Sequence, residues 1–377
     1  MKKQVLLIAA DLDPKDLGGA EVHVVEVVRR LAERINFTVL VGKSREISNV
    51  WPKNVDVRTV SYPQIVNFKN FAYIIYSVLA GGKILLNKRY DWLWAKQEFP
   101  QGVTAVILGK IFSVPVYVTA QNPRAYCEEM VLEGRIKRVS SLIIKFLERL
   151  VKMVMSHATI VAAVSSYSVK IAKQFGAKRT VIIPNGVDTS FFKIKQKGRF
   201  SSRITIVSHS TLIPRNAIDI VIKALSLLPR SISWKFLLAG DGPERKNLQS
   251  LVRNLHLVKQ IRFLGTLDKP AVVRVLAQGD IYVRPSRFEG FGVSFLEAMA
   301  MNLPVITTHC GGQKDFIIPD KTGVVVPVDD PKDVAWAIEK LAGNPNLQKK
   351  IVFNGRELVA KKYNWEVISQ KVYGIIS

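Results

Sequence analysis

Two glutamates eight positions apart are the residues best placed to do chemistry in this chain of 377 residues. Glu289 follows an apolar run that ends at Pro285, and Glu297 lies about one turn into a helical pattern that begins near Val293. Two carboxylates in these places can face one site and accept hydrogen bonds from the hydroxyl groups of a sugar and a ribose. Gly292 leaves the amides at the start of the helix open, and these amides can bind a diphosphate.

The same pair has a purely structural interpretation. Glu297 would complement the positive end of the helix, and Glu289 would be a solvated loop acid. Short acidic spacings recur by chance, so an isolated pair would favour this second interpretation. The surrounding sequence must decide between the two.

Short runs of Val, Ile and Leu alternate with helical patterns throughout the chain, which is typical of buried parallel strands. In the first half the predicted strands are residues 5–10, 37–41, 92–95, 116–120 and 160–164. In the second half they are residues 204–207, 234–239, 261–264, 281–284, 305–307 and 324–326. The pattern predicts an α/β protein with two Rossmann-like sheets.

The length of the chain also favours two domains, because single cores seldom grow beyond about 250 to 300 residues. We place the first domain at residues 1–184 and the second at residues 185–361. The connection between them is expected near the turn signal Asn185-Gly186. Ligands of such sheets bind beyond the carboxyl ends of the strands, where glycine-rich turns let phosphate approach the backbone.

The segment around the two glutamates closely resembles the E-x7-E signature of the retaining glycosyltransferases of family four, also called group 1. The matching residues are Pro285, Ser286, Glu289, Gly290, Phe291, Gly292, Glu297 and Ala298. Further matches, in the family's order, are Gly18-Gly19-Ala20-Glu21, residues 184–188 (PNGVD), residues 240–243 (GDGP), Gly311-Gly312 and Thr322-Gly323. Each is weak singly, but together they are specific.

The resemblance implies a GT-B architecture, in which two Rossmann-like domains face each other across a cleft. The second domain would bind a nucleotide-sugar donor and the first an acceptor, without a metal ion and with retention of the anomeric configuration. Glu289 would contact the hydroxyls of the donor sugar and Glu297 the ribose. The amides of Phe291, Gly292 and Val293, with those near Gly18 and Gly19, would meet the pyrophosphate. The last helix, about residues 362–377, would pack back onto the first domain.

The chain departs from the family at three places in the expected site, one of which is Asp315, near where the family commonly has Glu after the paired glycines. The family supplies an Arg and a Lys to the donor phosphates in a segment like G-R-L-x-x-x-K-G, where this chain has Thr211 and Asn216. Asn216 and the neighbouring Arg215 are the donor-binding candidates here, and Arg215 is expected to compensate in part. Gln121 stands where the family often has His; it can hydrogen-bond a sugar hydroxyl but cannot carry a proton. These departures keep open an alternative, a weak or inactive sugar-nucleotide-binding protein.

The net charge of +25 is the one extreme bulk property. Residues 134–157 form a basic amphipathic pattern that can lie on an anionic membrane, although an ordinary core-packed helix with a solvated basic face fits equally well. Together with the apolar residues 71–86, which are too short to span a bilayer, this pattern favours an acceptor carried on a membrane lipid. Nucleic acid is not expected, because the chain has no RNA-binding signature.

The remaining chemistry-bearing residues carry weaker signals. Cys127 and Cys310 are too few for a disulfide framework, and neither the cysteines nor the histidines show zinc spacing, so no metal site is expected. Asp11 and Asp13 are expected to have a loop or capping role. We predict a cytoplasmic enzyme, peripheral at the inner face of the cell membrane, that uses a UDP- or GDP-linked sugar and no further cofactor.

Overall fold

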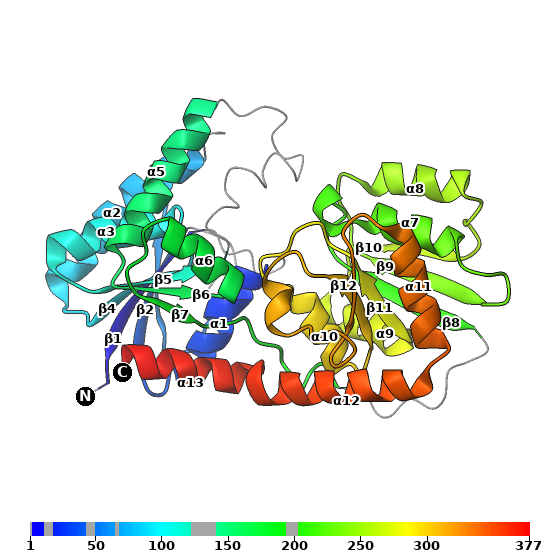
Figure 1. The fold of residues 1–377 in the computed structure, drawn as a ribbon. Coiled ribbons are helices and arrows are strands. Elements are labelled where there is room, and N and C mark those ends of the chain that lie inside the picture. Colours follow the sequence, from blue (N-terminus) through cyan, green and yellow to red (C-terminus); the bar gives the residue numbers. More distant parts are fainter. Residues whose placement is uncertain (1, 11–17, 43–49, 65–67, 122–140, 194–202) are drawn as a thin grey trace. The chain divides into compact units, whose positions relative to one another are not determined.

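The computed structural model describes residues 2–10, 18–42, 50–64, 68–121, 141–193 and 203–377. These residues form two compact units (Figure 1). Unit 1 consists of the described residues up to Gly186 together with Trp365–Ser377, and unit 2 consists of those in Val187–Asn364. Each unit has its own parallel sheet and its own core.

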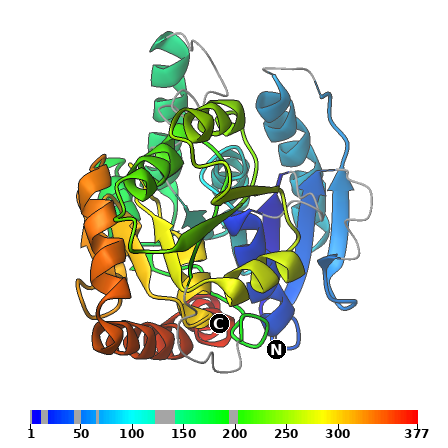
Figure 2. The ribbon, with the colours of Figure 1, turned by 90° about the vertical axis from the view of Figure 1, so that its right-hand side faces the viewer.

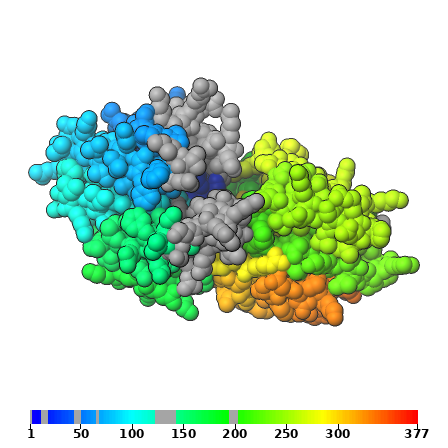
Figure 3. Space-filling model, turned by 90° about the horizontal axis from the view of Figure 1, so that it is seen from above, coloured from blue at the N-terminus to red at the C-terminus, as the bar shows by residue number. Residues whose placement is uncertain are grey.

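Unit 1 is built on a seven-stranded parallel sheet in the order β3-β2-β1-β4-β5-β6-β7. Its strands are β1 (Gln4–Ala9), β2 (Asn36–Gly42), β3 (Asp56–Val60), β4 (Trp92–Ala95), β5 (Val116–Ala120), β6 (Ile160–Ala163) and β7 (Thr180–Ile182). Its helices are α1 (Gly19–Leu31), α2 (Lys69–Asn87), α3 (Gln101–Phe112), α5 (Ser141–His157), α6 (Ser166–Gln174) and α13 (Trp365–Ile376). Figure 3 shows the surface that α2 forms, in blue.

Unit 2 has a six-stranded parallel sheet in the order β10-β9-β8-β11-β12-β13, covered by helices on both faces (Figure 2). Its strands are β8 (Ile204–His209), β9 (Trp234–Ala239), β10 (Ile261–Gly265), β11 (Ile281–Arg284), β12 (Val305–Thr308) and β13 (Val324–Val326). Its α-helices are α7 (Ile218–Ser226), α8 (Arg245–Asn254), α9 (Lys269–Gln278), α10 (Val293–Ala300), α11 (Pro331–Ala342) and α12 (Pro345–Lys362). Two 3-10 turns, η2 (Pro214–Asn216) and η3 (Gly312–Asp315), lie in its loops.

The strand runs expected in both halves of the sequence are confirmed, with end shifts of one or two residues. Two further strands, β3 and β7, were not predicted. Both are edge strands, and their residues are largely exposed or half-buried instead of forming an apolar run. Among the described helices, none is long and apolar enough to cross a membrane.

The last helix completes the core of unit 1. One face of the unit 1 sheet packs in a cluster that contains strand residues such as Trp94, helix α1 residues such as Val24, and four residues of α13. These four are Trp365, Ile368, Val372 and Ile376, all at most 3% exposed. Unit 1 is therefore made from both ends of the chain.

The chain passes between the units twice, and the two passages are adjacent. Val187 N donates to the Tyr363 carbonyl oxygen at 2.7 Å, and Val187 forms a bridge with Asn364. A Cβ on Gly186 would lie 2.7 Å from the indole of Trp365. The absence of a side chain at Gly186 thus lets the first passage approach the start of α13.

In each sheet the strand order reverses once. In unit 1 the strand order reverses between β1 and β4, and in unit 2 it reverses between β8 and β11. The loops beyond the carboxyl ends of two such strands diverge, which leaves room for a ligand. The candidate residues of unit 2 lie at this point.

Candidate functional site

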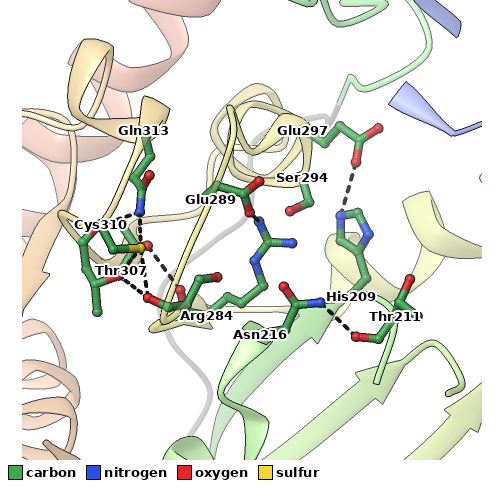
Figure 4. Close-up of polar contacts among 12 residues, drawn as sticks. His209, Thr211, Asn216, Arg284, Glu289, Ser294, Glu297, Thr307, Cys310 and Gln313 are labelled. Carbon is green, nitrogen blue, oxygen red and sulfur yellow. Dashed lines mark hydrogen bonds and ion pairs between the residues drawn. The ribbon is translucent and has the colours of Figure 1, made fainter. Parts of the chain in front are cut away.

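The ends of β8 and β11 and the start of α10 bring the main candidates of unit 2 together (Figure 4). His209 is the last residue of β8 and Arg284 the last of β11. Glu289 lies in the loop after β11, and Glu297 lies on α10. These side chains are therefore positioned by two neighbouring strand ends, by the loop after β11 and by the helix that follows this loop.

Gly292 determines where α10 begins. Its φ of 93° is in the left-handed region, and a Cβ there would lie 2.4 Å from the ring of Phe295. The helix starts at Val293, as expected, and no side chain of the described residues caps its N-terminus. The first amides of α10 are therefore open to an anionic group.

Glu289 is held by both its backbone and its carboxylate. Its carbonyl oxygen accepts a hydrogen bond from Gly312 N at 3.0 Å, and a Cβ on Gly311 would lie only 1.7 Å from the same oxygen. Its carboxylate accepts a hydrogen bond from Arg284 Nη2, and both side chains are about nine-tenths buried. The paired glycines are thus what allows the two loops to touch.

Glu297 faces the end of the neighbouring strand. Its Oε2 lies 3.1 Å from His209 Nε2, and both side chains are 16% exposed. Behind them the Tyr282 hydroxyl lies 3.1 Å from the His209 carbonyl oxygen and 3.0 Å from Ser294 Oγ. Burial raises the pKa of Tyr282, so the hydroxyl stays protonated and links β8, β11 and α10.

Arg284 is a buried cation that the sequence analysis did not single out. Its guanidinium lies 4.3 Å from the centre of the Phe295 ring. Nε is buried and has no hydrogen-bond partner among the described residues. An arginine that ends an otherwise apolar strand is the signal that could have identified it, because arginine is seldom buried unless it is paired.

The segment after β8 contains the predicted donor-binding pair Arg215 and Asn216. The Asn216 amide donates to the Thr211 carbonyl oxygen at 2.7 Å, and Asn216 is 3% exposed. The amide nitrogen is therefore used to hold its own loop. The Arg215 carbonyl oxygen accepts from Arg287 N at 2.8 Å, and the Arg287 guanidinium pairs with Asp219 at 2.8 Å.

Phe291 and Val293 flank the glycine at the start of α10. The Phe291 side chain is 4% exposed and packs against the rings of Phe316 and Tyr363 at 5.3 and 6.0 Å. Only the backbone of Phe291 is thus available to a ligand, which is the group that the sequence analysis assigned to it.

Cys310 lies beside the loop of Glu289. Its thiol donates to the Ser286 carbonyl oxygen at 2.9 Å, and the Gln313 amide donates to its sulfur at 3.0 Å. Burial raises the pKa of Cys310, which disfavours the thiolate form that acts as a nucleophile.

The predicted site residues Gly18 and Gly19 belong to unit 1. Gly18 is the N-cap of α1 with an ordinary φ of −71°, and Gly19 is the first residue of that helix. Glu21 in the first turn pairs with the buried Lys96, 2.5 Å away, just after β4. Asp11 and Asp13 lie outside the described residues.

Gln121 belongs to a buried polar group in unit 1 that also contains Asn185 and His23. The Asn185 amide donates to Gln121 Oε1 at 3.1 Å, and Asn185 Oδ1 lies 2.9 Å from His23 Nδ1. Burial outweighs this hydrogen bond and lowers the pKa of His23 to about 4, so the imidazole is neutral. The two residues predicted as catalytic, Glu289 and Gln121, thus lie in different units.

No cluster of three or more His, Cys, Asp or Glu side chains suited to a metal ion occurs within the ranges that the structure describes. The site consists of two carboxylates, one buried guanidinium and an open helix N-terminus. Such a set can bind hydroxyl groups and an anionic group side by side.

Two protein-family models match the chain. The model described as glycosyl transferases group 1 matches residues 190–358, and the model described as glycosyltransferase family 4 matches residues 17–191. The first match spans most of unit 2 and the second spans most of unit 1.

Individual proteins of known sequence or structure resemble the chain over long stretches. An uncharacterized glycosyltransferase of Methanocaldococcus jannaschii is 27% identical over 350 residues, 93% of this chain and 92% of the relative. A GDP-mannose-dependent phosphatidylinositol monomannoside mannosyltransferase of Mycobacterium tuberculosis is 29% identical over 56% of this chain and 60% of its own length. The crystal structure of Anabaena HepE in complex with UDP-glucose superposes with a TM-score of 0.79 at 18% identity, over 98% of this chain and 99% of HepE.

Proposed function

Because two family models together match residues 17–358, this chain belongs to the group 1 glycosyltransferases, and we propose that it transfers a sugar from a nucleoside-diphosphate donor with retention of the anomeric configuration. Its two α/β units are those of the GT-B fold. The observation that supports the proposal best is the placement of Glu289 and Glu297 on either side of an open helix N-terminus, at the point where the unit 2 sheet reverses.

In this proposal unit 2 binds the donor. Glu289 accepts hydrogen bonds from the donor sugar, Glu297 from the ribose, and the amides of Phe291, Gly292 and Val293 bind the diphosphate. These fixed dipoles stabilise the negative charge that develops on the leaving group. The departing phosphate takes the proton of the acceptor hydroxyl, so the chemistry requires neither a metal ion nor a protein nucleophile.

Unit 1 binds the acceptor in the same proposal. Gln121 hydrogen-bonds a sugar hydroxyl, and the backbone at Gly18 and Gly19 assists at the pyrophosphate. The buried group of Gln121, Asn185 and the neutral His23 keeps the amide of Gln121 in one orientation. Arg215 and Asn216 would complete the donor contacts in unit 2, Asn216 by supporting its loop.

The nucleotide is proposed to be UDP or GDP. HepE is crystallised with UDP-glucose, and the mycobacterial relative is named as GDP-mannose-dependent. Both nucleotides therefore belong in the first experiment.

The donor proposal is tested by thermal shift and slow donor hydrolysis with a panel of UDP- and GDP-sugars. The native chain is compared with Glu289→Ala, Glu297→Ala and the control Glu366→Ala, whose side chain is 83% exposed on α13. We expect one donor to stabilise the native chain and the control, and both site variants to lose this response. If no nucleotide sugar stabilises the native chain, the proposal is wrong.

A second candidate function is supported by the departures at Thr211 and Asn216. A chain that lacks two phosphate-binding cations could retain donor binding and lose turnover. Saturable binding of a nucleotide sugar without hydrolysis, and without transfer to any acceptor, would favour this sugar-nucleotide-binding protein over the enzyme.

The acceptor is proposed to be a lipid-linked or cell-surface glycan, with the enzyme peripheral at the inner face of the cell membrane. The support is a set of exposed apolar residues on α2 and α5 and at the start of α2; the two helices contact each other through the Phe71 and Phe146 rings, whose centres are 6.0 Å apart. The exposed residues are Phe68, Ile75, Leu79, Leu142, Ile143 and Phe146. Lys145, Arg149 and Lys152 lie on the same α5 helix, so apolar contact and attraction to anionic lipid can act together.

Vesicle sedimentation tests the membrane part separately. Ile75→Ser with Leu79→Ser is compared with Phe353→Ser in unit 2, where Phe353 is 66% exposed. We expect the native chain and the unit 2 control to sediment with phosphatidylglycerol vesicles at low salt, and the double variant to stay in solution. Equal sedimentation of all three, or of none, would refute a membrane role for these apolar residues.

A further inference from the structure

We propose that Arg284 is the cation that binds the donor diphosphate in this chain, in place of the two cations that are absent at Thr211 and Asn216. This inference rests on the proposed function, because it assumes that a nucleoside diphosphate binds at the reversal point of unit 2. It assigns a binding role to a residue outside the matched motifs.

The unused hydrogen-bonding capacity of Arg284 is the first argument. A guanidinium has five N–H groups. Within the described ranges only one of them is engaged, by the Glu289 carboxylate, while the side chain is 7% exposed and Nε is buried without a partner. Buried donors that lack acceptors are costly unless a ligand supplies the acceptors.

The position of Arg284 is the second argument. Its strand pairs directly with β8, Tyr282 opposite Val207, so its side chain emerges beside the segment that should carry the missing cations. Figure 4 shows the guanidinium directed toward Glu289, with Asn216 close by. The positive charge is thus present in the site but comes from β11 instead of from the loop after β8.

Arg287, in the loop that follows β11, already has its own carboxylate partners. Arg287 pairs with Asp219 at 2.8 Å and with Asp329 at 2.6 Å, and its Nη1 also donates to the Pro214 carbonyl oxygen. Its charge is neutralised by two carboxylates and serves to hold the loop. Among the described residues Arg284 pairs with one carboxylate, that of Glu289, and it keeps N–H groups for a second anion.

An alternative role for Arg284 is to hold Glu289 in place without touching the ligand. The two roles differ in what happens once the carboxylate has been neutralised. In a Glu289→Gln background a purely positioning arginine has no anionic partner left, so its further replacement changes diphosphate binding little. A phosphate-binding arginine still contributes in that background.

The experiment measures the dissociation constants of UDP, GDP, uridine and guanosine by calorimetry. The proteins are the native chain, Arg284→Gln, Arg284→Lys and the exposed β10 control Arg262→Gln, together with Glu289→Gln alone and combined with Arg284→Gln. Arg215→Gln is included because Arg215 is the other candidate for the same role. Thermal unfolding of each variant without ligand shows whether it is folded.

We expect Arg284→Gln to weaken binding of the preferred diphosphate by about 10- to 100-fold, as for the loss of a charge-assisted hydrogen bond, in both the native and the Glu289→Gln backgrounds. Binding of the nucleoside should change less than about threefold, and Arg284→Lys should recover part of the loss because it keeps the charge.

Two outcomes would overturn the inference while leaving donor binding intact. They are an unchanged diphosphate affinity in Arg284→Gln and a loss that disappears in the Glu289→Gln background. If the native chain binds neither diphosphate, the proposed function itself fails. The two failures are therefore distinguishable.

Discussion

The two units use the same strand order and place different chemistry at the point where it reverses. In unit 2 this point has an open helix N-terminus behind a left-handed glycine, two carboxylates and a buried arginine with unused donors. In unit 1 the helix after β1 starts at a glycine of ordinary φ, and its first-turn Glu21 is already paired with Lys96. The same topology therefore provides a candidate location in each unit, and backbone strain with a buried arginine distinguishes the location at which we propose that the diphosphate binds.

Alanine substitutions at Gly311 of unit 2 and Gly82 of unit 1 should differ most in their effect on the free energy of unfolding. A Cβ on Gly311 would lie 1.7 Å from a backbone oxygen of Glu289, whereas one on Gly82 in α2 meets nothing within 4 Å. We expect Gly311→Ala to lower the free energy of unfolding by about 3 kcal/mol or more, because two loops must separate. Gly82→Ala should raise it by about 0.5 to 1 kcal/mol through helix propensity. Urea unfolding measures both, and a tolerated Gly311→Ala would contradict the role of this contact.

We expect acid to lower the free energy of unfolding through His23 of unit 1. The pKa of His23 is about 4 in the folded chain against 6.5 when it is unfolded, so the unfolded chain takes up a proton first as the pH falls. The stability that the protein gains by burying His23 in its neutral form is fully present above pH 6.5 and is lost between pH 6.5 and 4. Over this range the free energy of unfolding should fall by about 2 to 3 kcal/mol.

Replacement of this histidine supplies the measurement. His23→Gln should flatten the decline between pH 6.5 and 4 in urea titrations. His256→Asn, at an exposed position of unit 2, should leave the decline in place. An unchanged slope in His23→Gln would show that another group causes the acid sensitivity.

Alanine substitutions at Gly292 and Gly18, which stand at the starts of α10 and α1, should differ by an intermediate amount in their effect on stability. Gly292→Ala must place an alanine at φ 93° and against the Phe295 ring, so we expect a loss of about 2 kcal/mol together with loss of donor binding. At Gly18 the φ is −71° and the nearest atom to a Cβ is the movable carboxylate of Glu21, so Gly18→Ala should cost less than about 1 kcal/mol. Equal effects at the two positions would remove the distinction drawn between the units.

Two buried tyrosines give the smallest contrast. The Tyr282 hydroxyl has two polar neighbours, whereas the buried Tyr117 hydroxyl on β5 of unit 1 has no hydrogen-bond partner among the described residues. Tyr282→Phe should cost about 1 kcal/mol, and Tyr117→Phe should be neutral or slightly stabilising. Thermal unfolding of the two variants measures the difference, and a destabilised Tyr117→Phe would point to a missed partner.

The sequence predicted the fold well where strands are buried on both faces. Runs such as residues 234–239 and 281–284 recur as β9 and β11, because a strand between two helical layers must be apolar throughout. Strand β3 was missed because it has one exposed side, and β7 because it has three residues at the sheet edge. Edge strands need less apolar surface, so their sequence carries less signal.

The candidate site was predictable only where backbone conformation is encoded locally. Gly292 and the start of α10 followed from the order of residues along the chain. The contacts of Glu289 with Arg284 and of Glu297 with His209 depend on which strands become neighbours, which is a property of the folded sheet. Asn216 was assigned to the donor by its place in a motif, and the structure adds a local hydrogen bond to Thr211 that no motif specifies.

The division of unit 1 between the two ends of the chain has a consequence for biosynthesis. Translation delivers residues 187–364 before Trp365, so the whole of unit 2 is synthesised before α13, which belongs to unit 1. Until α13 emerges, the core cluster that contains Val24, Val28 and Leu31 of α1 lacks its four residues from α13. The core of unit 1 can therefore close only after unit 2 has been synthesised, and a chain that terminates before Trp365 would leave this core incomplete.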